Sequence, residues 1–136
     1  MTPALIQRNP YRGNPQRAWV RVQIRDGSGN VRDLDLLADT GSPCPIIIGS
    51  EDTGFMSLIP GYGMSSNFGD LIAGWLQIVI PDIGFDQQVL GYASDAVVSA
   101  AQESSSSFSG LIGLPLLRLM QYGGDSDNFW IRPPGN

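Results

Sequence analysis

The sequence of 136 residues contains no histidine and no lysine, so all eight of its basic residues are arginines. Without these residue types the chain cannot form a Ser-His or Cys-His nucleophilic site, a histidine-containing metal site or a lysine Schiff base. Carboxylates are the acid-base groups that remain for hydrolytic chemistry. The sequence therefore directs the search for a catalytic site to its aspartates and glutamates.

Cysteine and long apolar runs are also scarce. Cys44 is the only cysteine, which excludes an intrachain disulfide and a thiolate cluster, and its expected role is packing as a small apolar side chain. No apolar run approaches the ~18 residues of a membrane-spanning helix, and the first residues lack the order of a secretory signal. These absences predict a soluble protein without a membrane partner, with a cytoplasmic location favoured.

The net charge of −5 argues against a nucleic-acid partner, although Arg8, Arg12 and Arg17 give the first residues a local basic bias. Residues 1–17 are rich in proline, asparagine and arginine, a composition that predicts a flexible N-terminal arm. A chain of this length with 42% hydrophobic residues suits one folded unit. We therefore expect a single domain over residues 18–136.

Alternating hydrophobic residues and glycine-containing turns predict a mostly β fold. Val20, Val22 and Ile24 alternate with polar residues, which is the pattern of a half-buried strand. A loop containing the serine run 104–107 is expected before the apolar segment at 111–113. Further strands are expected at residues 31–38, 46–49, 71–80, 87–93 and 128–131, and one short helix around Leu116, Leu117 and Met120.

The stretch from Leu36 to Ser42 (Leu-Leu-Ala-Asp-Thr-Gly-Ser) places a carboxylate at the end of an apolar strand. A peptide bond can be hydrolysed when one carboxylate takes a proton from water while a second, protonated carboxyl gives a proton to the carbonyl oxygen. Two carboxyls in contact share one proton, because like charges at that distance cannot both ionise. Gly41 would bring its backbone N–H to the carboxylate of Asp39, and the hydroxyls of Thr40 and Ser42 would hold the geometry.

A second Asp-Thr-Gly begins at Asp52, thirteen positions after Asp39. Two lobes of a pepsin-like chain each need their own barrel, so two copies at this spacing cannot both be catalytic. Asp39 follows an apolar strand, whereas Asp52 follows the polar turn Gly49-Ser50-Glu51. Asp39 is therefore the predicted catalytic residue, and Asp52 is expected to be a loop or helix N-cap aspartate.

The order of these features resembles the retroviral-type aspartic proteases, the retropepsins, over residues 18–131. The resemblance implies a closed acid-protease (retropepsin-like) β-barrel with one short C-terminal helix, and no cofactor or metal. It implies catalysis by Asp39 and packing of an apolar-apolar-Gly element behind the catalytic loop. The matching residues are the loop Asp39, Thr40, Gly41 and Ser42, the packing element Leu111, Ile112 and Gly113, and Leu116-Leu117 beyond it.

The resemblance also implies a hairpin flap near residues 65–70 that covers the substrate. Methionine and aromatic residues in a glycine-rich loop can fold over an apolar peptide while backbone groups hydrogen-bond an extended strand. An equally good interpretation is that these side chains anchor a surface loop. The residues expected to form the flap and touch substrate are Tyr62, Met64, Asn67, Phe68 and Gly69.

One catalytic aspartate per chain requires a second, which a homodimer with two-fold symmetry would supply at its axis. We therefore expect a homodimeric aspartic endopeptidase that cleaves peptide or protein substrates. The chain termini could interleave into an intersubunit sheet, for which residues 128–131 have the composition, or could close the chain's own sheet.

Two other functions remain open. After Gly113 this sequence has Leu114-Pro115, where the family has Arg-Asp or Arg-Asn, and this removes polar groups that help some relatives dimerise. This difference from the family is the reason for a second hypothesis, that the chain is a catalytically silent retropepsin-like domain used for dimerisation or peptide binding. A generic β-barrel binding module is the third possibility, and it requires Asp39 to be solvent-exposed and unpaired.

Overall fold

The computed structural model describes residues 5–66, 69–103 and 107–135, apart from the side chains of residues 60–70. It contains strands (β), α-helices (α) and 3-10 helices (η). In chain order these are β1 (Gln7–Pro10), β2 (Trp19–Arg25), β3 (Val31–Asp39), β4 (Ile46–Ile48), η1 (Ser50–Phe55), β5 (Ser57–Ser66), β6 (Gly69–Ile80), η2 (Pro81–Ile83), β7 (Phe85–Ala93), α1 (Asp95–Gln102), β8 (Gly110–Gly113), α2 (Leu114–Leu117), β9 (Gln121–Gly124) and β10 (Asn128–Arg132).

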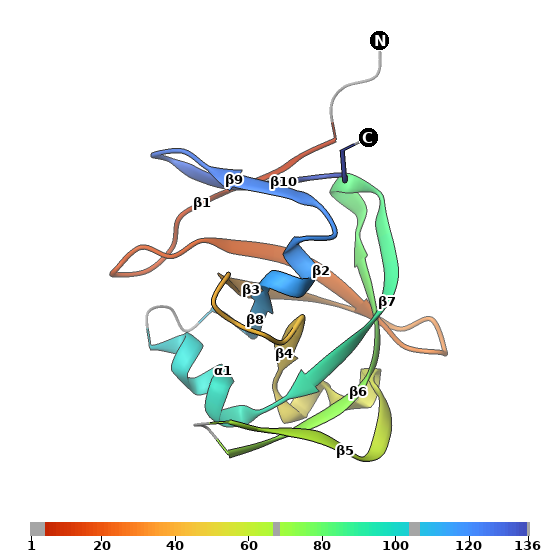
Figure 1. The fold of residues 1–136 in the computed structure, drawn as a ribbon. Coiled ribbons are helices and arrows are strands. Elements are labelled where there is room, and N and C mark those ends of the chain that lie inside the picture. The colour runs from red at the N-terminus through yellow and green to blue at the C-terminus, as the bar shows by residue number, and fades with distance from the viewer. Residues whose placement is uncertain (1–4, 67–68, 104–106, 136) are drawn as a thin grey trace.

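The fold is mostly β, as the sequence predicted, and its centre is a closed barrel of six strands (Figure 1). The strand order is β2-β3-β8-β4-β7-β6, and β6 closes the barrel by pairing with β2. The pairs β3–β8 and β4–β7 are parallel, and the other pairs of the barrel are antiparallel. Strand β5 pairs with β6 and carries the sheet beyond the barrel as one arm of a long hairpin.

The barrel interior is filled by alternate residues of its strands. Val20, Val22 and Ile24 of β2 have no exposed surface, which confirms the strand predicted from their alternation. Burial of an aliphatic side chain of this size contributes about 1.5–3 kcal/mol. Leu34 and Leu36 of β3 face the same core, so the strand that ends at Asp39 is anchored in the barrel.

The β5–β6 hairpin is longer than the sequence suggested. Residues 60–64 were expected to lie in a glycine-rich loop, but they belong to β5, whose register shifts between Leu58 and Gly63. Gly74 explains part of the difference, because a Cβ there would lie 2.9 Å from the carbonyl oxygen of Ser57. The glycine lets the two arms approach closely where an ordinary residue would push them apart.

Helix α1 was not predicted; only a loop was expected before β8. Ser94 caps the helix, because its hydroxyl accepts a hydrogen bond from the N–H of Val97 at 3.3 Å. Val97 and Ala101 are buried against the barrel. The fold therefore has α1 in addition to α2, the short C-terminal helix that the sequence did predict.

Part of the expected N-terminal arm is a strand. β1 pairs with β10, and β10 pairs with β9 on its other side, giving a three-stranded antiparallel sheet that lies across one end of the barrel (Figure 1). The side chains of Gln7 and Asn9 are buried beneath it. The polar composition that suggested flexibility instead supplies hydrogen bonds to the barrel.

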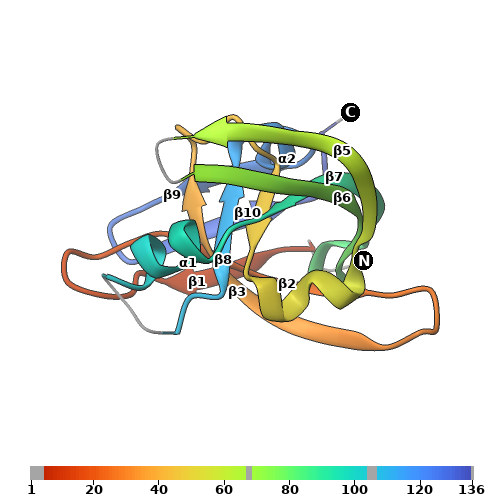
Figure 2. The ribbon, with the colours of Figure 1, turned by 90° about the horizontal axis from the view of Figure 1, so that it is seen from below.

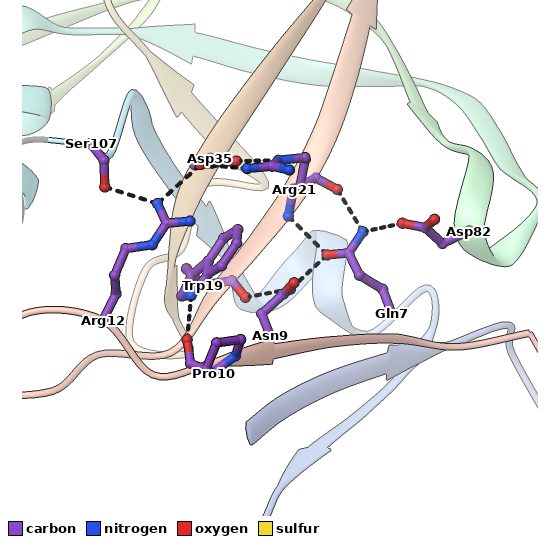
Figure 3. A network of polar contacts seen from close by, with 9 residues as sticks. All are labelled: Gln7, Asn9, Pro10, Arg12, Trp19, Arg21, Asp35, Asp82 and Ser107. Atoms are coloured by element: carbon purple, nitrogen blue, oxygen red, sulfur yellow. Dashed lines mark hydrogen bonds and ion pairs between the residues drawn. The ribbon is translucent and has the colours of Figure 1, made fainter. Parts of the chain in front are cut away.

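Figure 3 shows these hydrogen bonds, which tie the N-terminal segment to β2 and β3. The Arg12 guanidinium lies 3.5 Å above the ring of Trp19, and its Nη1 donates to Asp35 Oδ2 at 3.0 Å and to Ser107 Oγ at 2.8 Å. Arg21 makes two further bonds to Asp35. Burial alone would raise the pKa of Asp35, but the bonds from Arg21 and Arg12 hold it below its ordinary value. The cluster joins three parts of the chain that are distant in sequence.

Among the helices that the structure describes, none has both the length and the apolarity needed to cross a bilayer.

Candidate functional site

The loop of residues 40–45 joins β3 to β4 across the end of β8, which lies between these two strands (Figure 2). Asp39 at the end of β3 is paired with Gly113 at the end of β8. The N–H of Gly113 donates to the carbonyl of Pro45 at 2.9 Å, which fixes the far side of the loop. The carboxylate of Asp39 is therefore carried by a backbone that is held on both sides.

Asp39 itself is partly buried, and its Oδ1 accepts a hydrogen bond from the N–H of Gly41 at 3.0 Å. This is the contact expected from the sequence. The N–H of Ser42 donates to the carbonyl of Asp39 at 3.1 Å, which completes a tight turn. The backbone thus orients the carboxylate.

The two hydroxyl groups of the loop lie in different surroundings. Thr40 is exposed at the turn. Ser42 is buried, and its Oγ bonds to the backbone of Cys44, accepting from the N–H at 3.2 Å and donating to the carbonyl at 3.3 Å. Ser42 therefore supports the loop through the residues after it rather than through the carboxylate.

Leu111, Ile112 and Gly113 form β8 and lie directly beside the strand that ends at Asp39. Ile112 is fully buried, and Leu111 is buried on the opposite side of the strand in a second apolar cluster. A Cβ on Gly113 would overlap the carbonyl oxygen of Cys44 and lie 3.0 Å from that of Ser42. Glycine at this position is therefore required by the close approach of the loop of residues 40–45.

A hollow of about 250 Å³ opens beside Asp39. It is smaller than the pockets that hold drug-sized ligands, and suits a single side chain. Arg17 and Glu103, both exposed, provide one charge of each sign at its edge. Its other lining residues are Leu37, Ala38 and Ala100. Sequence analysis missed the contributions of Arg17, which it placed in an arm, and of α1, although the Ser94-Asp95 start and the alanines of the helix were a detectable signal.

The expected flap lies at the end of the β5–β6 hairpin. Tyr62 and Met64 belong to β5, and Gly69 begins β6 with Ser66 opposite it. Asn67 and Phe68 lie outside the described residues, as do the side chains of the other expected substrate contacts. The backbone register of the hairpin is described as far as Ser66 opposite Gly69, and the flap role stays a prediction.

The second Asp-Thr-Gly lies in a different environment from the first. Asp52 has no exposed surface and lies within η1, whose N-cap is Gly49, so the expectation of a loop or helix N-cap aspartate was wrong. Its Oδ1 is 3.1 Å from Nε of Arg32, yet neither carboxylate oxygen has a hydrogen bond among the described residues. Burial raises the pKa of Asp52, Arg32 partly offsets this, and Glu51 adds to it. Asp52 is inaccessible to a substrate.

Arg32→Gln is expected to lower the free energy of unfolding by about 2 kcal/mol at neutral pH, because it leaves a buried carboxylate without its cation. Burial raises the pKa of Asp52 in the folded state. The free-energy cost of burying its charge is therefore absent at a pH below its ordinary pKa of 3.8, where the carboxyl is protonated in both states, and this cost grows as the pH rises through the folded-state pKa. The loss should therefore shrink toward pH 3.8, as measured by urea unfolding at several pH values.

The double variant Arg32→Gln, Asp52→Asn is the control for that measurement. It removes the charge that needs neutralising, so it should be more stable than Arg32→Gln at neutral pH. An equal loss from Arg32→Gln at acidic and neutral pH would show that the ion pair does not stabilise η1.

Comparison with known proteins returns no match to a family model, to a curated protein or to a solved structure.

Proposed function

We propose that this protein is an aspartic endopeptidase of the retropepsin-like type, in which Asp39 from each of two copies activates a water molecule. The observation that carries the proposal is the loop of residues 39–45. It presents one oriented carboxylate at the end of a barrel strand, beside a hollow of side-chain size. This arrangement supplies one of the two carboxyl groups that hydrolysis of a peptide bond requires.

The chemistry requires two carboxyl groups in contact. One carboxylate accepts a proton from water as the water attacks the peptide carbonyl, and the other, protonated carboxyl donates to the carbonyl oxygen. Asp52, the other aspartate of an Asp-Thr-Gly sequence, is buried beside Arg32 and cannot serve. A second Asp39 across a two-fold axis supplies the missing group.

The test is to incubate the purified protein with a diverse peptide mixture from acidic to neutral pH and to read new termini by mass spectrometry. The proposal predicts cleavage within extended apolar segments. It also predicts inhibition by a peptide that carries a hydroxyl-bearing tetrahedral centre in place of the scissile bond, because such a centre resembles the transition state. Absence of cleavage at every pH would reject the peptidase.

A second candidate is a catalytically silent dimerisation or peptide-binding domain. It is favoured by Leu114-Pro115, which form the start of α2 directly after Gly113 and place apolar groups where the family has polar ones. Peptides that bind to the protein and are recovered intact would support this candidate.

A further inference from the structure

The three-stranded sheet β1-β10-β9 has two edge strands, β1 and β9. Its central strand, β10, is paired on both sides within the chain. β10 pairs with β1 along residues 128–131 and with β9 along residues 129–132. It therefore cannot supply an intersubunit strand, which the composition of residues 128–131 had suggested. Any strand added from another molecule must pair with β1 or with β9.

The two edges differ in how well they resist such pairing. β1 ends in Pro10, which has no N–H, and carries the exposed charge of Arg8, and both are features that protect an edge strand. The sequence of β9 is Gln-Tyr-Gly-Gly, with neither proline nor charge. β9 is the unprotected edge.

The hairpin that joins β9 to β10 sets which backbone groups of β9 are available. The N–H of Asp125 donates to the carbonyl of Asn128 at 3.0 Å, so this pair is hydrogen-bonded. Bonded and non-bonded pairs alternate along an antiparallel ladder. Gly123 therefore bonds to β10, whereas the N–H and C=O groups of Tyr122 and Gly124 point toward the free edge.

The two glycines of β9 are explained by packing inside the chain. A Cβ on Gly123 would lie 2.6 Å from the ring of Trp130, and one on Gly124 would overlap the hydroxyl of Tyr11. The two rings cover the strand from opposite faces, because the Cβ positions of adjacent strand residues point to opposite sides of the sheet. Their presence accounts for the glycines without closing the edge to another strand.

We propose that a second copy of this chain pairs its β9 with β9 in antiparallel fashion, about a two-fold axis at Gly123. Tyr122 then lies opposite Gly124 of the second copy, and the outward backbone groups of these residues bond to one another on both sides of the axis. The same segment, residues 121–125, serves both partners, as a two-fold interface requires. The result is a continuous six-stranded sheet, β1-β10-β9 followed by β9-β10-β1 of the second copy.

This inference rests on the proposed function for its choice of partner, because a peptidase with one Asp39 per chain is incomplete without a second copy. Leu119, just before β9, has 42% of its surface exposed and adds apolar area beside the strand. Four residues of edge pairing bury less than a standard interface, so Leu119 contributes area that the strands alone lack.

The register makes a charge test possible. With Gly123 on the axis, Gln121 lies opposite Asp125 of the second copy. Like charges directly opposite across a ladder destabilise it, and opposite charges stabilise it. Gln121 is exposed, so its charge can be changed without disturbing the core.

The experiment measures the dimer dissociation constant by sedimentation over a concentration series for Gln121→Glu, Gln121→Arg and the unaltered protein. We expect Gln121→Glu to raise the constant about fivefold and Gln121→Arg to lower it about threefold, with both effects reduced by high salt. Gln87→Glu and Gln87→Arg are the matched controls, because Gln87 is an exposed residue of β7, and they should leave the constant unchanged.

A protein that is monomeric at every concentration, or a dimer whose dissociation constant is the same with either change at Gln121, would overturn the inference. Peptide cleavage measured on the same samples separates the two proposals. Dimers that respond to Gln121 but never cut a peptide would uphold the interface and reject the peptidase. Cleavage that depends on Asp39, by a dimer whose dissociation constant is unaffected by the changes at Gln121, would uphold the peptidase and reject the interface.

Discussion

Asp39→Asn is expected to lower kcat/KM for peptide cleavage by about 10³-fold or more, the scale of a lost general acid-base group. An amide has the size of the carboxylate but cannot take a proton from water. Its Oδ1 can still accept the N–H of Gly41, so the loop should keep its conformation. Cleavage rates should be compared at equal concentrations of folded protein, with thermal unfolding showing that the variant is as stable as the original.

Two control variants sharpen this prediction. Asp33→Asn changes an exposed aspartate of the same strand, β3, and should leave cleavage unaltered. Glu103→Gln changes the other carboxylate of the hollow and should retain the greater part of the activity. If Glu103→Gln were as inactive as Asp39→Asn, the second carboxyl would come from the C-cap residue of α1 in the same chain, and the need for a homodimer would disappear.

Gly113→Ala is expected to abolish cleavage and to lower the free energy of unfolding by about 3 kcal/mol, at the upper end of overpacking effects. The added Cβ would overlap the carbonyl oxygen of Cys44, and the three nearest atoms are all backbone atoms of Ser42 and Cys44, which cannot rotate away as the end of a side chain could. Relief requires the loop of residues 40–45 to move away from β8, which displaces Asp39. Urea unfolding and cleavage rates measure the two effects.

Gly54→Ala provides the matched control, because nothing lies within 4 Å of a Cβ added there. It lies in the second Asp-Thr-Gly and should be close to neutral in both measurements. A Gly113→Ala variant with normal stability and activity would mean that the loop does not rest against β8 as described.

Sequence reasoning succeeded where the signal was local. The alternation of Val20, Val22 and Ile24 reports which face of β2 is buried, and that information lies within the strand itself. The same holds for the turn at Asp39, where a glycine two positions later brings its N–H back to the carboxylate. Such features depend on neighbouring residues and can be predicted from them.

The missed features depend on partners far away in the sequence. Gln7 and Asn9 look like residues of a solvated arm until Arg21 and Trp19 are placed beside them. Asp52 looks like a surface aspartate because nothing near it in sequence shows that Arg32 of β3 will lie against it. Helix α1 is an exception. Its N-cap, Ser94, could be recognised from the sequence, but the serine run that follows the helix led to the prediction of a loop for the whole segment.

The parallel pairing of β3 with β8 has a consequence for the order in which the protein forms. β8 comes late in the chain, so a growing polypeptide carries Asp39 long before the strand that fixes it has been made. Contacts between such distant residues form slowly, because a large loop must close before they can stabilise anything. During synthesis the end of β3 and the loop of residues 40–45 therefore lack their support from β8 until Gly113 has been added, and the site assembles together with the closing barrel.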